Sequence, residues 1–339
     1  MINLLDNLVK PLYYWGMAPR RSPRHAWLGA GLALGLAVTP ALPAGRASAT
    51  TPTAGGGDVA GRLSVGGRVR TYLVHRPPGF HAGLPVVLAF HGGGGTAAGM
   101  ARLSGLDAVA DAHGFVVVYP QGIGNSWAGG KGDTPADEAG VDDVGFVDAL
   151  IDRLVAEDGI DPTRVFATGM SSGGFMTQRL GCQLASRIAG IAPVAATLIE
   201  TIAQTCAPGV RMPVLEIQGT ADPLVPYGGG HVRGRGPGGN PTLAAPATIA
   251  HWATVNGCSA PPRTAALPVV ARDGTRVRTD TYPCPGGPVV LYTVVGGGHT
   301  WPGGEQYLPV RVVGRTTRQF NASETIWAFF ASIPPRPTG

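Results

Sequence analysis

"ATGMSSGGFM", residues 167–176, is the stretch that decides the fold. Gly169, Ser171 and Gly173 fit the pattern G-x-S-x-G, in which a nucleophilic serine sits on a sharp turn between a strand and a helix. The pattern alone is a weak signal, because a chain of 339 residues with 53 glycines matches it easily by chance. The surrounding segments must therefore decide whether Ser171 is a nucleophile or part of a Gly-rich loop.

The segments around this stretch have the strand-to-helix order that the pattern requires. Residues 163–170 predict a strand, and the residues after Ser171 predict a helix. Further strands are predicted over 68–77, 84–90, 114–122, 213–219 and 288–298, and helices over 143–159, 246–257 and 321–333. Asn321 is expected to cap the last helix, with Glu324 as its reciprocal partner. The alternation predicts an α/β fold with a mostly parallel, doubly wound sheet and helices on both faces.

Two downstream motifs supply partners for Ser171 in chain order. Asp222 lies in "QGTADPLVPY" (218–227), just after one predicted strand, and His299 lies in "GGGHTWPGG" (296–304), just after another. The carboxyl ends of parallel strands meet at one edge of a sheet, where such folds gather their sites. A serine hydroxyl needs a base to attack an ester. The order predicts Ser171 as nucleophile, His299 as general base and Asp222 as the group that orients the imidazole.

The glycine run "HGGGG", residues 91–95, is expected to stabilise a developing oxyanion through backbone amides. One donor is predicted to be the amide of Ser172, and the other that of Gly93, with Gly92 as the alternative. A phosphate-binding loop would require a following G-K-[ST], which the sequence lacks. His91 is expected to bond nearby backbone rather than substrate.

Two tryptophans near the predicted site are expected to contact substrate. Trp127 follows the strand predicted over 114–122, and Trp301 lies two residues beyond His299. A flat apolar surface suits an acyl chain or an aromatic ring, although core packing explains Trp301 equally well. The Gly-rich segment 228–240 is expected to be a surface loop.

The N-terminus predicts export from the cytoplasm. Within residues 1–49, Arg20, Arg21 and Arg24 precede an apolar run and the small-residue pattern "ASA" (47–49), an arrangement that is typical of a cleaved signal peptide. Met17 is an alternative start, and an uncleaved anchor is the alternative interpretation. Residues 50–60 are expected to be a linker and 61–335 one catalytic domain. The expected location is secreted or periplasmic, without a stable membrane anchor after cleavage.

Charge and cysteine content exclude some functions and favour others. The net charge is +5, and residues 1–49 carry all but one of these charges, so nucleic acid is not an expected partner. An even number of cysteines in an exported chain predicts two disulfides, with three possible pairings, of which the sequential one closes short loops. No C-x-x-C spacing favours a metal, so neither metal nor cofactor is predicted. The cysteines are Cys182, Cys206, Cys258 and Cys284.

Seven motifs together resemble one known family. They are "HGGGGT", "YPQG", "DDVGFV", "IDPTRVFATGMSSGG", "GTADPLVPY", "NGC" and "GGGHTWPGG". In this order, from about residue 60 to 335, the chain resembles the secreted polyhydroxybutyrate depolymerase and feruloyl esterase group of the α/β-hydrolases. The resemblance implies the same Ser171, Asp222 and His299 triad and a bond between Cys258 and Cys284. Many extracellular polyester depolymerases add a separate substrate-binding domain, and none is expected here.

The predicted function is that of a secreted, monomeric serine carboxylesterase. It would hydrolyse polyester or oligoester bonds of the polyhydroxybutyrate type through an acyl-enzyme. A feruloyl or acetylxylan esterase acting on plant-wall esters is the main alternative. A serine peptidase on the same fold and a non-catalytic binding protein are further alternatives, which amide substrates and active-site labelling would test.

Overall fold

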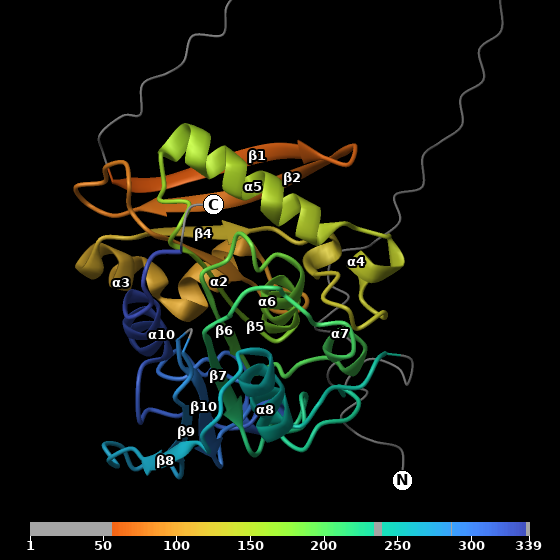
Figure 1. Ribbon diagram of the computed structural model, residues 1–339, viewed down its shortest axis with the longest axis vertical. Helices are drawn as coiled ribbons and strands as arrows, with labels where there is room; N and C mark the ends of the chain where they lie inside the picture. Colours follow the sequence, from red (N-terminus) through yellow and green to blue (C-terminus); the bar gives the residue numbers. More distant parts are fainter. Residues whose placement is uncertain (1–55, 234–238, 286, 337–339) are drawn as a thin grey trace, which may run out of the picture.

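The computed structural model describes residues 56–233, 239–285 and 287–336. The predicted export signal and the middle of the Gly-rich segment 228–240 lie outside the described residues. Within them, ten strands form one sheet in the order β1-β2-β4-β3-β5-β6-β7-β10-β9-β8 (Figure 1). The strands are β1 (Gly57–Val65), β2 (Arg68–Arg76), β3 (Val86–Phe90), β4 (Val116–Pro120), β5 (Val165–Met170), β6 (Gly190–Val194), β7 (Val214–Gly219), β8 (Arg263–Ala266), β9 (Arg276–Tyr282) and β10 (Val289–Val295).

The central strands are parallel and the edges are antiparallel. The parallel set runs β4-β3-β5-β6-β7-β10, while β1 with β2 and β8 with β9 form antiparallel pairs at the two edges. The mostly parallel, doubly wound sheet predicted from the sequence is confirmed. Its helical segments are α2 (Ala97–Ser104), α3 (Leu106–His113), η1 (Ile123–Asn125), α4 (Pro135–Glu138), α5 (Asp143–Asp158), α6 (Ser172–Gln183), α7 (Glu200–Ala203), α8 (Ala245–Val255), α9 (Val310–Val313) and α10 (Ala322–Ala331).

Helices cover both faces of the sheet, which explains the continuous apolar runs of the central strands. On β3, Val86, Leu88 and Phe90 join the core under α5, α6 and α8. The alternate residues Val87 and Ala89 join the opposite core, under α2, α3 and α10. Both side-chain rows of the strand are therefore buried, as is usual for parallel sheets.

The structure differs from the sequence prediction at the N-terminal edge. Residues 50–60 were expected to be a linker, yet β1 begins at Gly57 and pairs with β2 along its whole length. Most β1 side chains are exposed, so the strand carries no hydrophobic period that sequence analysis could detect. The folded domain therefore starts earlier than predicted.

The last helix begins where it was predicted, but its cap is simpler. Asn321 Oδ1 accepts hydrogen bonds from the amides of Ser323, at 2.8 Å, and Glu324, at 3.2 Å. The Glu324 carboxylate lies 3.1 Å from His113 Nε2 at the end of α3, so its recorded partner is this imidazole rather than the backbone of Asn321. The expected reciprocal cap is thus replaced by a contact between α10 and α3.

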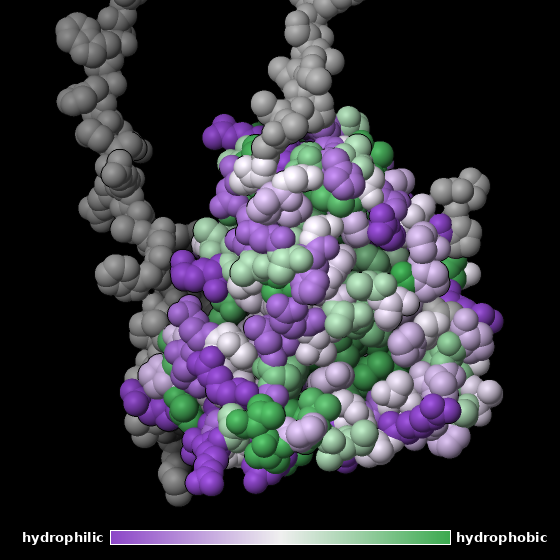
Figure 2. Space-filling view, turned by 90° about the vertical axis from the view of Figure 1, so that its left-hand side faces the viewer, coloured by the Kyte–Doolittle hydropathy of each residue, from purple (hydrophilic) through white to green (hydrophobic). Residues whose placement is uncertain are grey.

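The surface shows no single extended apolar face in the view of Figure 2, where hydrophilic and hydrophobic residues are interspersed. Among the described residues, the large hydrophobic side chains that are exposed are valines: Val59, Val69, Val210, Val269, Val270, Val295 and Val310. In the part of the chain that the structure describes, no helix has the length and apolar content needed to cross a bilayer.

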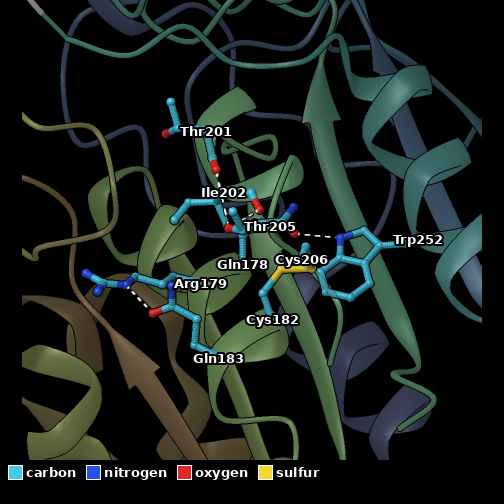
Figure 3. Close-up of a disulfide and its surroundings, with 9 residues drawn as sticks. All are labelled: Gln178, Arg179, Cys182, Gln183, Thr201, Ile202, Thr205, Cys206 and Trp252. Carbon is cyan, nitrogen blue, oxygen red and sulfur yellow. Dashed lines mark hydrogen bonds between the residues drawn. A yellow bond between two sulfur atoms is a disulfide. The ribbon is translucent and has the colours of Figure 1, made fainter. Parts of the chain in front are cut away.

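Two disulfides have the sequential pairing. Cys182 in α6 bonds Cys206, which follows α7, and Cys258 after α8 bonds Cys284 after β9. The first bond lies beside Trp252 of α8 (Figure 3). Trp252 Nε1 donates to Gln178 Oε1 at 2.8 Å, so a disulfide and a buried hydrogen bond both fasten α6.

The turn between β5 and α6 has a backbone conformation that few residues other than glycine adopt. Ser171 has φ 56° and ψ −120°. An added Cβ would lie 2.6 Å from the carbonyl oxygen of Gly173 if placed on Gly169, and 2.5 Å from Ala196 Cβ if placed on Gly174. On Gly173 it would overlap the carbonyl oxygen of Phe90 at the end of β3. Three glycines therefore allow Ser171 to project at the carboxyl edge of the sheet.

Removing the first disulfide should lower stability. Replacing both Cys182 and Cys206 by alanine should reduce the free energy of unfolding by roughly 3 kcal/mol, because an unfolded loop of 24 residues is no longer closed. Urea denaturation measures this, with the Cys258→Ala/Cys284→Ala variant as the matched comparison for a loop of 26 residues. An unchanged free energy of unfolding would contradict the expected stabilisation.

Gly173→Ala should displace the serine turn, because the new methyl group overlaps the Phe90 carbonyl oxygen and has only backbone as its neighbour. We expect a loss of about 1–3 kcal/mol in the free energy of unfolding. We also expect a fall of about a hundredfold in kcat on a soluble ester. Gly228→Ala is the control, since a Cβ placed there meets no atom within 4 Å other than those of its chain neighbours. Full activity in the Gly173→Ala variant would refute the steric argument.

Candidate active site

Asp222 and His299 meet at the carboxyl edge of the sheet. Asp222 follows β7 and His299 follows β10, and these two strands are parallel neighbours. His299 Nδ1 lies 2.8 Å from Asp222 Oδ2, and both side chains are buried. A hydrogen bond to a carboxylate places the proton on Nδ1 and leaves the Nε2 lone pair available to a third group.

The aspartate–histidine pair is fixed by the surrounding backbone. Asp222 Oδ1 accepts from the amides of Leu224 and Val225, each at 2.8 Å. The backbone of His299 donates to the carbonyl of Val313 at 2.6 Å, and its own carbonyl accepts from the Tyr307 hydroxyl at 2.9 Å. The carboxylate and the imidazole therefore hold their orientation without substrate.

Ser171 and His299 line the same recess. It has a volume of about 1110 Å³, open solvent included, and we call it the histidine recess. Its apolar walls are Met100, Leu103, Leu308, Val312 and Val313. Between the described side chains of Ser171 and His299 the structure records no direct hydrogen bond. Such bonds are often long before substrate binds.

A second recess also borders Ser171. It has about 560 Å³, open solvent included, and we call it the lysine recess. Gly93 and Ser171 line both recesses. The side chains that line only this one include Trp127, Lys131, Thr134, Phe175, Val232 and Arg233. Lys131 and Arg233 were not predicted as site residues, and their positions depend on loops that carry no recognisable motif.

The residues expected to hold an oxyanion lie beside Ser171. Ser172 is the first residue of α6, and its amide has no acceptor among the described residues. The amides of Gly92 and Gly93 likewise have none there, whereas Gly94 donates to Asn125 and Gly95 to Gly92. The bonds of Gly94 and Gly95 shape the loop and leave the two preceding amides available.

His91 supports this loop from beneath. Its Nδ1 donates to the Gly92 carbonyl at 2.8 Å, and its Nε2 accepts from the Gly122 amide at 3.0 Å. Burial lowers the pKa of His91 to about 4, although the bond to Gly92 works in the opposite direction. The imidazole is thus neutral at ordinary pH, and its expected structural role agrees with its contacts.

The two tryptophans differ in their position. Trp301 is fully buried and lines neither recess, and its Nε1 donates to Ser323 Oγ in α10 at 3.0 Å. The expectation that Trp301 contacts substrate is therefore wrong, because α10 covers it. Trp127 is also buried but lines the lysine recess, with its Nε1 donating to the His91 carbonyl at 2.9 Å.

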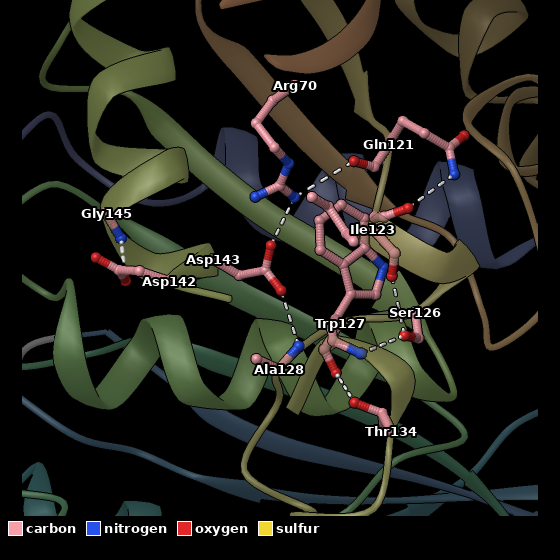
Figure 4. Close-up of polar contacts among 12 residues, drawn as sticks. Arg70, Gln121, Ile123, Ser126, Trp127, Ala128, Thr134, Asp142, Asp143 and Gly145 are labelled. Carbon is pink, nitrogen blue, oxygen red and sulfur yellow. Dashed lines mark hydrogen bonds and ion pairs between the residues drawn. The ribbon is translucent and has the colours of Figure 1, made fainter. Parts of the chain in front are cut away.

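A buried ion pair holds the loop that carries Trp127 (Figure 4). Arg70 of β2 lies 2.6 Å from Asp143 Oδ1, and Asp143 Oδ2 accepts from the Ala128 amide at 2.8 Å. Burial raises the pKa of Asp143, while the bonds from Ala128 and Arg70 oppose this effect. This role of Asp143 could not be predicted from the sequence, because its partner Arg70 lies 73 residues away.

One cluster away from the site has residues that can ligate a metal. Single donor atoms of Asp58, His75 and Asp107 lie within 4.8 Å of one another. His75 Nδ1 is bonded to Asp58 at 2.8 Å and its Nε2 to Asp111 at 2.9 Å. These contacts join β1, β2 and α3, and none of the four residues lines either recess.

Acidification should destabilise the protein through His91. Its unfolded side chain binds a proton below about pH 6.5, whereas the folded one does so only near pH 4. The free energy of unfolding is therefore highest above pH 6.5 and falls as the pH drops toward 4. His91 accounts for roughly 3 kcal/mol of this loss. Free energies of unfolding of the protein and of His91→Gln should be compared at pH 7 and 4.5. Equal losses in the two proteins would exclude His91 as the cause.

Comparisons with known proteins support an esterase. The chain is 37% identical over 286 residues to "Putative esterase NocK" of Nocardia uniformis subsp. tsuyamanensis, covering 81% of this chain and 83% of that protein. It is 31% identical over 242 residues to "Feruloyl esterase B" of Piromyces equi, covering 68% of this chain and 42% of that protein.

The fold and the family agree with these relatives. The structure resembles an acetyl xylan esterase from Aspergillus awamori with a TM-score of 0.53 and 19% identity, covering 71% of this chain and 94% of that one. The family model described as esterase PHB depolymerase matches residues 70–225, from β2 to the residues that follow Asp222. The chain therefore belongs to the esterase PHB depolymerase family of carboxylic ester hydrolases.

Proposed function

We propose that the chain is an exported serine carboxylesterase that hydrolyses oligoester or polyester bonds of the polyhydroxybutyrate type. Ser171 is its nucleophile, His299 its general base and Asp222 the orienting carboxylate. The observation that carries the proposal is the buried 2.8 Å bond between His299 and Asp222, in a recess that Ser171 also lines. The strained turn at Ser171 is typical of a serine nucleophile on this fold.

The proposed reaction proceeds through an acyl-enzyme. Ser171 Oγ attacks the ester carbonyl while His299 Nε2 takes its proton, and the resulting imidazolium stays bonded to Asp222. The amides of Ser172 and Gly93 donate to the oxyanion, with Gly92 as the alternative to Gly93. His299 then returns the proton to the leaving alcohol oxygen. A water molecule, deprotonated by the same imidazole, releases the acid and restores Ser171.

Two features support the exported location and the substrate class. Disulfides persist in oxidising compartments, and the described chain contains two. The signal peptide proposed over residues 1–49 lies outside the described residues. The histidine recess has apolar walls, which suit an oligomer chain, and the family description names polyhydroxybutyrate depolymerases.

Plant-wall ester hydrolysis is the second candidate. It is favoured by the relative from Piromyces equi, whose name is that of a feruloyl esterase. A panel of hydroxybutyrate oligomers, methyl ferulate and acetylated xylan separates the two candidates. The proposal requires the highest kcat/KM on hydroxybutyrate oligomers, and a higher value on methyl ferulate or acetylated xylan would replace it with the second candidate.

Ser171→Ala should lower kcat on a soluble ester by about 10⁴-fold or more, because the nucleophile is lost. Asp222→Asn should cause a similarly large loss, because an amide that donates to Nδ1 favours the wrong imidazole tautomer. Initial rates measure both effects, and circular dichroism checks that the variants are folded. Ser186→Ala, at an exposed serine just beyond α6, is the matched control and should keep full activity. A Ser171→Ala variant within tenfold of the native rate would contradict the assignment.

A further inference from the structure

We propose that the lysine recess binds the acyl side of the ester and that Lys131 selects acyl groups that carry an oxygen acceptor on the chain beyond the ester carbonyl. The inference rests on the proposed function, since it assigns the two sides of an ester to the two recesses beside Ser171. Lys131 then determines which acyl groups the protein accepts.

The position of His299 indicates which recess receives the alcohol side of the ester and which receives the acyl side. The leaving alcohol oxygen receives its proton from His299 Nε2, so the alcohol side must begin where this imidazole is accessible. His299 lines the histidine recess and does not line the lysine recess. Ser171 and Gly93 line both recesses. The ester carbonyl carbon must lie between the nucleophile and an oxyanion donor, so it lies where the two recesses meet. The acyl chain therefore extends into the lysine recess.

The lining of the lysine recess favours a short chain that carries oxygen. Trp127, Phe175 and Val232 offer apolar contact to its carbon atoms, while Lys131 and Arg233 are the charged residues of the lining. The Thr134 hydroxyl is already bonded to the Trp127 carbonyl and to Asp137. No carboxylate is among the described residues that line this recess. A hydroxyl, ester carbonyl or carboxylate oxygen would accept a charge-assisted hydrogen bond from the ammonium. A plain alkyl group would offer the ammonium no such bond.

Lys131 is held in place before substrate binds, so its side chain loses little conformational entropy on binding. Its side chain is buried and its Nζ lies 3.1 Å from Asp133 Oδ1. The Lys131 carbonyl accepts from the Asn240 amide at 2.8 Å, and the Gly130 carbonyl from Asn240 Nδ2 at 2.9 Å. An added Cβ on Gly129 would lie 3.0 Å from a side-chain atom of α6, so the loop packs closely on that helix. A group fixed before binding contributes more to selectivity than a mobile one.

Three methyl esters with similar acyl chains test the proposal. Beyond the ester carbonyl, the chain of methyl butyrate carries no oxygen, that of methyl 3-hydroxybutyrate carries a hydroxyl on C3, and that of monomethyl succinate ends in a carboxylate. We expect kcat/KM of the native protein to be roughly tenfold or more higher for at least one oxygen-bearing ester than for butyrate. Whichever of the two is preferred identifies hydroxyl or carboxylate as the acceptor.

The decisive variant is Lys131→Met/Asp133→Asn, which removes the ion pair without leaving a buried unpaired carboxylate. In it the preference over butyrate should fall to about one. Arg263→Met removes an exposed positive charge from β8, at the far edge of the sheet, and should keep the native preference. Titration with a fluorophosphonate counts intact active centres in every variant, so a misfolded protein is recognised and its rates are corrected.

The outcomes separate this inference from the proposed function. A native protein with equal kcat/KM on all three esters overturns the inference alone, as does a preference that survives the double substitution. A native protein that cleaves none of the tested esters overturns the proposed function and the inference with it. Loss of the preference in the double variant, with butyrate still hydrolysed, supports both.

Discussion

The left-handed backbone of Ser171 is the constraint on which the rest of the site depends. A serine with φ 56° costs about 1–3 kcal/mol, and it persists only where its surroundings enforce it. Here β5 and α6 enforce this conformation. Gly169 before the serine and Gly173 and Gly174 after it allow the helix to approach the strand and the end of β3. The same close approach brings the 91–95 loop, which continues from β3, next to the serine. The close packing of α6 against β5 and the end of β3 therefore positions both the nucleophile and the oxyanion donors.

The order of the strands supplies the remaining groups. Asp222 and His299 are 77 residues apart in sequence, yet β7 and β10 are hydrogen-bonded neighbours and deliver both side chains to the same edge. Because β8 and β9 continue the sheet beyond β10, the strand that carries His299 is not an exposed edge. The geometry of the pair therefore follows from sheet topology, and local hydrogen bonds only refine it.

Much of this arrangement could be predicted from the sequence because its signals are short. Strands buried on both faces appear as continuous apolar runs, and the turn at Ser171 appears as glycines at fixed spacing. The burial of Trp301 could not be predicted, since it depends on Ser323 in a helix that begins some twenty residues later. The Arg70–Asp143 pair and the position of Lys131 were missed for the same reason, since long-range contacts of loops carry no local period. β1 was missed because its side chains are mostly exposed.

The central claim is that this turn presents Ser171 as an activated nucleophile. Mass spectrometry of the protein after reaction with a fluorophosphonate tests it most directly, because the reagent modifies serines that an adjacent base activates. The account predicts one adduct per chain, on the peptide that contains Ser171. An unlabelled chain, or an adduct on another residue while Ser171 stays unmodified, would contradict it.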